Sequence, residues 1–304
     1  MYRSTTMSGS VQSEAAAGSA MTRRNSTART LRLVGRIALY VVMIALAVMF
    51  LVPLAWVAST SLKTSAEVFV QPVQWVPKIP RWDNYIEVFR RLPFHRFVIN
   101  SLFVTTMGTI GSVLSSLLVA FGLAKIRWPG RDVLFAMLVA TMMLPGVVTM
   151  IPVFIIFKYL KLVGTFYPLW APSWFGGAFY IFLMRQYMLT LPNELNEAAK
   201  IDGANNFIIL WRVVAPLCGP AIASVAIFSF LGHYNDFMGP LIYISDNMMY
   251  TLPMGLLWFQ GRFGQFWHLV MAASMISVAP VIVLFFAAQR YFIEGVQFSG
   301  LAGR

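Results

Sequence analysis

The chain has 304 residues, of which 59% are hydrophobic and 11% are charged, and its formal net charge is +12. Soluble globular chains carry about 25% charged residues, so this composition predicts a membrane protein. It excludes an intrinsically disordered chain, which needs low hydrophobicity, and a disulfide scaffold, because Cys218 is the single cysteine. The basic residues lie in short groups between apolar runs, so nucleic acid is not an expected partner.

Apolar runs divide the chain into membrane spans. Residues 1–32 are rich in Ser, Thr, Ala and Gly and predict a disordered cytoplasmic tail. The run from 34 to 58 can cross a hydrocarbon core of about 30 Å and is too long for a signal peptide. With it, the later runs predict an all-α integral membrane bundle of six helices within residues 33–304. These later runs cover residues 97–124, 133–157, 168–188, 221–244 and 266–291.

The basic residues of the short loops predict that both termini are cytoplasmic. With the N-terminus inside, the inner segments hold about 14 Lys and Arg residues, the pattern that the positive-inside rule requires. The outer short loops hold Lys158, Lys161 and Arg262. The outer segment 59–96 is longer and mixes acidic with basic residues, so its basic residues count less in the positive-inside rule.

The long inner hydrophilic stretch after the fourth run predicts two short helices joined by a turn. Thr190 is expected to cap the first helix, and Gly203 is expected to follow that helix in the left-handed conformation. Either Asn205 or Asn206 can then cap the second helix, residues 207–214, before a proline ends it. The pair of helices would present a small rigid surface on the inner side.

This stretch resembles the EAA loop of the permease subunits of bacterial ATP-binding-cassette importers. The resemblance is carried by Glu197-Ala198-Ala199, by Gly203 four residues later, and by Val213-x-Ala215-Pro216. In the last string the family has Ile where this chain has Val213, and Leu where it has Ala215. The whole chain after its tail is most similar to the second permease subunit of maltose-type sugar importers. Supporting strings in matching order are Ser61-Leu62-Lys63, Asn84-Tyr85, Asn100-Ser101-Leu102, Pro129-Gly130-Arg131, Met142-Met143-x-Pro145, Ile151-Pro152, Asn235-Asp236-Phe237, Thr251-Leu252-Pro253 and Gln289-Arg290-Tyr291.

The resemblance implies a permease subunit, not an enzyme, that forms half of the path for an oligosaccharide or related polyol across the bacterial plasma membrane. Implied partners are a homologous second permease, two cytoplasmic ATPase subunits that carry ATP and Mg, an extracytoplasmic solute-binding protein and membrane lipid. No cofactor is expected on this chain, which has no G-x-x-x-x-G-K-[ST] phosphate loop. The residues implied to couple to the ATPase are Glu194, Glu197, Ala198, Ala199, Asp202, Gly203 and Pro216.

Read locally, Glu197 and Gly203 also fit an ordinary helix with an acid in its N-terminal half and a glycine after its end. The family resemblance favours docking over this simpler interpretation. Replacing either residue is expected to uncouple ATP hydrolysis from transport without preventing membrane insertion.

A polar group marks the fifth apolar run. Ser229, His233 and Asp236 have the spacing of one helix face. An ionisable residue at membrane depth normally faces a bundle interior or a water cavity. These residues either line the solute path or form hydrogen bonds between helices near the outer end, and the second interpretation is favoured. A metal site is not expected, since two ligands without a third do not hold an ion.

Aromatic residues in and before the fourth run could stack on the faces of a sugar, although packing and interfacial anchoring are their commoner roles. The candidate residues for the solute path are Ser229, His233, Asn235, Asp236, Trp174 and Tyr180.

Three other functions stay open at this stage. The same machinery could carry a glycerophosphodiester or a polyamine, because the loop motif says nothing about cargo. An ion-coupled carrier usually has internal repeats and several intramembrane ionisable residues, and neither is evident. A membrane-embedded enzyme is disfavoured because no catalytic constellation is apparent.

Overall fold

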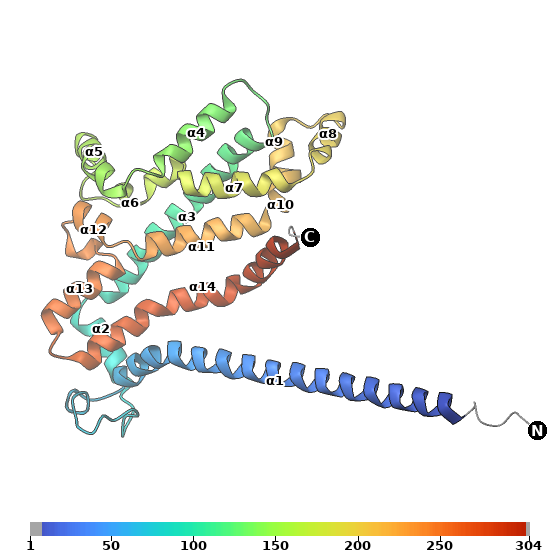
Figure 1. Cartoon of the computed structure of the whole chain (residues 1–304). Helices are drawn as coiled ribbons and strands as arrows, with labels where there is room; N and C mark the ends of the chain where they lie inside the picture. Colours follow the sequence, from blue (N-terminus) through green and yellow to red (C-terminus); the bar gives the residue numbers. More distant parts are fainter. Residues whose placement is uncertain (1–7, 302–304) are drawn as a thin grey trace, which may run out of the picture. The chain divides into compact units, whose positions relative to one another are not determined.

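The computed structural model describes residues 8–301, with side chains for residues 33–287 and 289. Every regular element in residues 8–301 is a helix (Figure 1), as the sequence predicts. The chain divides into two compact units, residues 1–58 and 59–304.

Helix α1, Ser8–Ser61, makes up the described part of the first unit, and its last three residues are assigned to the second unit. Its residues 33–61 are long and apolar enough to cross a membrane, where the first span was expected. The helix continues back to Ser8, through most of the stretch predicted as a disordered tail, whose first seven residues lie outside the described residues. No proline interrupts residues 8–32, and extending an existing helix is far cheaper than nucleating one. Composition alone therefore did not locate the start of this helix.

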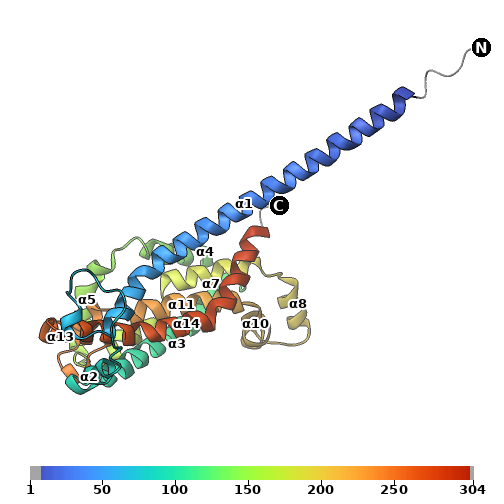
Figure 2. The same ribbon diagram turned by 90° about the horizontal axis from the view of Figure 1, so that it is seen from below.

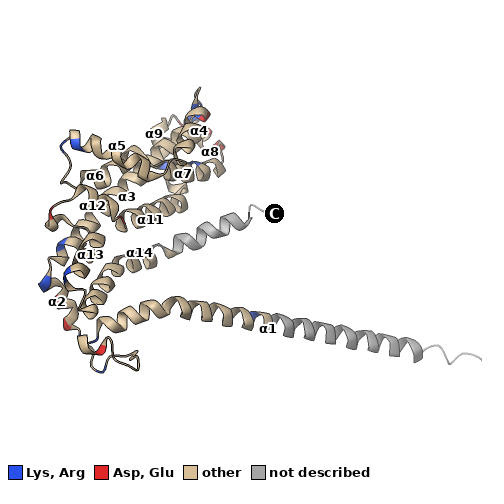
Figure 3. Ribbon diagram, turned by 60° about the vertical axis from the view of Figure 1, so that its left-hand side comes forward, with Lys and Arg blue, Asp and Glu red and all other residues tan. Residues whose placement is uncertain are grey.

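The second unit is built around α3, Phe94–Ala124. This helix contacts α7, Ala178–Thr190, and α11, Gly219–Tyr234. Its most apolar stretch is 56% buried, against 22% for α14, Trp267–Leu301. Charged residues gather near the ends of these helices, and the ribbons of α3 and α11 are uncharged over nearly all their length (Figure 3). The centre of the unit is therefore an apolar packing of α3, α7 and α11.

Three described helices are individually long and apolar enough to cross a membrane, residues 33–61, 94–124 and 267–287. The number becomes five if each of two bent helix pairs forms one span. One such pair is α4, Arg131–Thr141, and α5, Gly146–Tyr159, bent by 100° where a single span was expected at 133–157. Pro145 lies at the break, where it cannot continue the hydrogen-bond ladder of α4.

The fourth and fifth expected spans are also divided. The stretch 168–188 contains α6, Tyr167–Trp170, a 3-10 turn, and then α7, whose 13 residues are fewer than the roughly 20 a span needs. The stretch 221–244 breaks after α11 at Tyr234 and resumes as α12, Met238–Tyr243. The count of six spans therefore stays a prediction.

A face of small residues on α3 lets its neighbours approach closely. Gly108, Gly111 and Ser112 share one helix face. A Cβ added at Gly108 would overlap the His233 imidazole of α11, and one added at Gly111 would overlap the Trp174 indole. Small residues at helix contacts are the usual means of close packing in membranes. The two glycines thus hold aromatic rings directly against the backbone of α3.

The two ends of the second unit carry different structures. Figures 1 and 2 show α8 to α10 at one end of α3, α7 and α11, and α2 and α13 at the opposite end. Here α2 is Asp83–Arg91 and α13 is Leu252–Phe263. The inner loop and the outer segment predicted from sequence therefore lie at opposite ends of the helices.

At the α2 end, residues from different motifs of the family resemblance form hydrogen bonds with one another. The Asn84 amide donates hydrogen bonds to the carbonyls of Ser61 at 2.8 Å and Lys63 at 2.9 Å. Likewise the Ser101 hydroxyl accepts from the backbone N–H of Leu252 at 2.6 Å. These polar residues have a structural role, because each joins two segments that are distant in sequence.

Gly108→Ala is expected to lower the thermal stability of the purified protein, because the added methyl group overlaps the His233 ring. Overpacking a well-packed core costs about 1–3 kcal/mol. Gly122→Ala on the same helix is the matched control, since nothing lies within 4 Å of its added Cβ. Thermal unfolding in detergent measures both variants. Equal melting temperatures for the two would contradict the close contact at Gly108.

Candidate functional site

Helix α8, Glu194–Ile201, carries the central part of the predicted coupling loop. Thr190 does not cap it, contrary to the sequence prediction. Thr190 is the last residue of α7, and its hydroxyl donates to the Tyr187 carbonyl at 2.7 Å. Asn193 takes the capping position instead. The residue before Pro192 is extended, as residues before proline prefer, so α7 ends there and α8 begins after the proline.

The end of α8 agrees with the prediction. Gly203 has φ +82°, and its N–H donates to the Lys200 carbonyl at 3.0 Å. The left-handed conformation expected of this glycine is therefore confirmed. Of the two asparagines considered as the next cap, Asn205 is the one used, because its side chain accepts from the N–H of Ile208 at 2.9 Å.

The second helical stretch runs further than predicted. It comprises α9, Asn206–Ile208, a π-helical segment, Ile209–Val214, and α10, Ala215–Leu217. Pro216 was expected to end this helix, but it lies within the first turn of α10, where a missing N–H costs little. The chain then bends by 82° into α11.

A half-buried lysine holds α8 to the end of α3. Lys125 directly follows α3, and its ammonium donates to the Leu191 carbonyl at 2.7 Å and to the Asn193 side chain at 3.0 Å. Burial lowers the pKa of Lys125, and the nearby Glu194 carboxylate opposes this shift. The two hydrogen bonds attach the start of α8 to the central helix.

The coupling loop has one buried side and one exposed side. Ile209, Leu210 and Val214 are buried in a cluster formed with side chains of α3 and α7. On the other side, Ile201 is 87% exposed and Phe207 is 65% exposed. We call the exposed side the loop surface. It consists of Glu194, Glu197, Ala198, Ile201, Asp202, Gly203 and Phe207.

Of the remaining residues predicted to couple, Ala199 is half-buried against the apolar cluster and Pro216 is exposed. The structure therefore brings most of the predicted coupling residues to one exposed side, with Ala199 beneath them and Pro216 beyond the second helical stretch.

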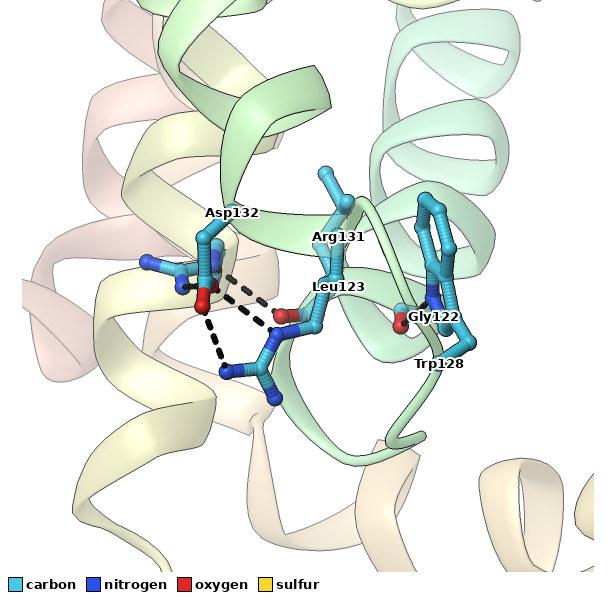
Figure 4. Close-up of polar contacts among 6 residues, drawn as sticks. Gly122, Leu123, Trp128, Arg131 and Asp132 are labelled. Atoms are coloured by element: carbon cyan, nitrogen blue, oxygen red, sulfur yellow. Dashed lines mark hydrogen bonds and ion pairs between the residues drawn. The ribbon is translucent and has the colours of Figure 1, made fainter.

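Arg185, which the sequence analysis did not single out, joins three helices beside the loop. Arg185 of α7 is 8% exposed, and its Nε donates to the Leu123 carbonyl of α3 at 3.2 Å. Its guanidinium lies 3.8 Å from the ring centre of Phe135 on α4 and 3.6 Å from the Asp132 carboxylate. Figure 4 shows Asp132 beside Arg131, which donates to it at 3.0 Å. The sequence signal was an arginine inside an apolar run, which is rare without a partner.

Hydrogen bonds between helices surround two of the candidate solute-path residues. The Ser229 hydroxyl donates to the Ser112 hydroxyl of α3 at 2.9 Å. His233 lies 2.8 Å from the Ser173 hydroxyl through Nε2 and 2.8 Å from the Ser229 carbonyl through Nδ1. Both side chains thus join α11 to its neighbours, the interpretation favoured from sequence. A role in the solute path stays a prediction.

Asp236 does not share this helix face, so the predicted spacing is wrong at this residue. Helix α11 ends at Tyr234, and the Asp236 carboxylate accepts from the N–H of Gly239 at 3.0 Å near the start of α12. The adjacent Asn235 donates back to the Leu231 carbonyl at 2.9 Å. Helical periodicity stops applying once the helix ends.

The two aromatic candidates lie on different elements. Trp174 belongs to the 3-10 turn before α7, and its indole N–H donates to the Met107 carbonyl at 3.0 Å. Tyr180 lies on α7 and is half-buried, with its ring edge-on to Phe179. Among the residues described, no group of three or more His, Cys, Asp or Glu side chains is placed to hold a metal ion.

These helices define a multi-pass helical membrane protein with an anchored loop exposed at one end. A family model described as the binding-protein-dependent transport system inner membrane component matches residues 112–297. This is more than half of the chain and includes the whole coupling loop. The chain belongs to this family of transport-system permease components.

Relatives and a solved structure agree with the family. The sulfoquinovosyl glycerol transport system permease protein SmoH of Agrobacterium fabrum is 31% identical over 83% of this chain and 89% of that protein. The arabinooligosaccharides transport system permease protein AraQ of Halalkalibacterium halodurans is 33% identical over 73% of this chain and 79% of that protein. A chain of a bacterial ABC transporter that imports the acidic polysaccharide alginate superposes with a TM-score of 0.75 at 26% identity, covering 86% of this chain and 97% of that one.

Lys125→Met is expected to loosen α8 because both of its hydrogen bonds to the loop are lost. Hydrogen bonds to charged groups are worth about 1.5–3 kcal/mol, so amide exchange in residues 194–202 is expected to accelerate by about tenfold or more. Hydrogen exchange with mass spectrometry measures this. Arg212→Met, at an exposed residue of the same loop, is the control. Unchanged exchange in Lys125→Met would contradict the anchoring role.

Asp236→Asn separates a structural from a solute-binding role. An asparagine oxygen can still accept from the Gly239 N–H, so uptake is expected to keep its KM. Asp236→Ala loses that hydrogen bond and is expected to cost about 1 kcal/mol of stability, the usual net contribution of one hydrogen bond. Uptake kinetics and thermal unfolding check the pair. A raised KM in Asp236→Asn with unchanged stability would instead place the carboxylate in the solute path.

Proposed function

We propose that the chain is the permease subunit of an ATP-driven bacterial importer for a carbohydrate, and that its coupling loop docks with cytoplasmic ATPase subunits. The cargo class is supported by the names of its relatives, which are permease proteins of a sulfoquinovosyl glycerol transport system and an arabinooligosaccharides transport system. The importer of the similar solved chain takes in a polysaccharide. An oligosaccharide or related glycoside is therefore the proposed solute.

One observation carries the docking proposal, the exposed loop surface on a firmly attached loop. Ile201 and Phe207 expose apolar side chains beside acidic residues of α8, and an exposed apolar patch with a polar rim is typical of a protein interaction site. Lys125 attaches α8 to α3, and Arg185 attaches α7 to α3 and α4. A partner that moves α8 would therefore move these helices with it.

The rest of the machinery follows from the family. The working transporter would contain a second, homologous permease, two ATPase subunits that bind ATP and Mg, and an extracytoplasmic solute-binding protein. The family description, a binding-protein-dependent inner membrane component, supports the binding protein and the bacterial plasma membrane. In this arrangement the chain converts motion and catalyses no reaction itself.

Uptake measured in vesicles that contain the assembled transporter tests the proposal. Uptake of a glycan should require ATP on the side of the coupling loop and the binding protein on the other side. Uptake driven by an ion gradient without ATP would indicate a secondary carrier. Capture of a glycerophosphodiester or a polyamine by the binding protein, with no affinity for glycans, would overturn the carbohydrate assignment and keep the coupling mechanism.

Substitutions of Gly203 separate backbone strain from docking. Nothing lies within 4 Å of a Cβ added there, but φ is +82°. Asn tolerates this conformation, whereas a β-branched residue does not. Gly203→Val and Gly203→Asn are both expected to reduce solute transported per ATP by about fivefold or more, the effect of about 1 kcal/mol at an interface.

The control for these variants is Gly261→Ala, which also has open space at its Cβ and lies on α13 away from the loop. Transport and ATPase rates are measured on equal amounts of assembled complex. Normal coupling in Gly203→Asn together with failure of Gly203→Val would limit the glycine to a backbone role. Loss of assembled protein in both variants would indicate a folding role.

A further inference from the structure

A cleft of about 460 Å³ lies between α8 and the turn that follows α3. This volume is many times the roughly 30 Å³ that one water molecule occupies, so the cleft can hold a small hydrated group. It is lined by Ala124, Lys125, Ile126, Arg127, Arg131, Leu189, Asn193, Asn196, Glu197 and Lys200. The lining therefore contains four cationic side chains and one acid.

Two of the cations have their partners within the protein. Lys125 donates to the start of α8, and Arg131 pairs with Asp132. Arg127 and Lys200 form no side-chain hydrogen bond or ion pair with any residue whose side chain the structure describes. Their two charges face the same cleft from opposite sides, the turn and α8, and are available to a ligand.

The Asn196 side chain adds a neutral donor to the same cleft. Asn196 as a whole is 8% exposed, and its amide lines the cleft and forms no hydrogen bond with the side chains that the structure describes. Asn196 and Lys200 supply N–H donors from α8, and Arg127 supplies them from the turn after α3. The excess of positive charge selects an anion with several acceptor oxygens, and a phosphate group has this chemistry.

The position of the cleft indicates where such a phosphate would come from. Its lining begins at Ala124 and Lys125, at the point where the membrane-spanning helix α3 ends. The exposed indole of Trp128 lies in the same turn and donates to the Gly122 carbonyl at 3.1 Å. Trp and basic residues at the end of a span are typical of the headgroup level of the bilayer. Basic pockets between helices at this level bind anionic phospholipid headgroups.

We propose that this cleft binds a phosphate group beside the coupling helix, supplied by an anionic phospholipid of the inner leaflet. The ligand contacts Arg127, Lys200 and the Asn196 amide. Because Glu197 and Lys200 belong both to α8 and to the cleft lining, a bound headgroup would add an attachment between α8 and the membrane surface.

The proposal is tested on the assembled transporter by native mass spectrometry during titration with phosphatidylglycerol. The doubly substituted Arg127→Gln, Lys200→Gln variant is expected to bind the tightest phosphatidylglycerol roughly 25-fold more weakly, which is about fivefold for each lost basic contact. Arg212→Gln, an exposed basic residue of the same loop outside the cleft, controls for general attraction of anionic lipid and should bind as the unchanged protein does.

Two further arms distinguish the source of the phosphate. Phosphatidylcholine has a phosphate but no net charge and should not compete. Inorganic phosphate, titrated at constant ionic strength with chloride as control, should raise thermal stability only if a soluble anion occupies the cleft, and that result would replace the lipid by a free phosphate. Equal phosphatidylglycerol binding by the double variant and Arg212→Gln, with no response to inorganic phosphate, would overturn the proposal.

Discussion

The second unit depends on the close approach of its helices to one face of α3. Helices in lipid gain little from the hydrophobic effect, so their association relies on tight packing and on hydrogen bonds between helices. Gly108 and Gly111 leave room for the rings of His233 and Trp174, and this closeness brings the Ser112 hydroxyl within 2.9 Å of Ser229. The position of α7, which follows the Trp174 turn, and hence of α8, follows from this contact.

The loop proposed to couple to the ATPase is attached to the helices of the unit in two ways. Leu210 and its neighbours bury the apolar side of the loop against α3 and α7. Lys125 and Arg185 each donate to a backbone carbonyl on another segment, which offsets the cost of burying their charge. Polar attachments of this kind are directional, so they fix the orientation of α8 more closely than apolar packing alone.

The sequence predicted local features well and tertiary ones poorly. The left-handed Gly203 and the Asn205 cap could be predicted because their chemistry involves only neighbouring residues. The error at Thr190 arose because Pro192 sets where α7 ends and α8 begins. The error at Asp236 arose because helical periodicity was extended beyond the end of α11 at Tyr234. The small-residue face of α3 was missed although its spacing, Gly108 followed by Gly111 and Ser112, is visible in the sequence. The 100° bend between α4 and α5 was also missed, although Pro145 lies where the two helices separate.

Photo-cross-linking from α8 tests most directly the central claim that this helix docks with the ATPase. Cys218 is buried, so a Cys218→Ser background allows a photoactivatable maleimide to be attached at Ala198→Cys, on the loop surface, or at Lys158→Cys, an exposed control outside it. The account predicts an ATPase adduct from Ala198→Cys in the assembled transporter and none from Lys158→Cys. The absence of an ATPase adduct from Ala198→Cys, in a complex that still transports solute, would contradict it.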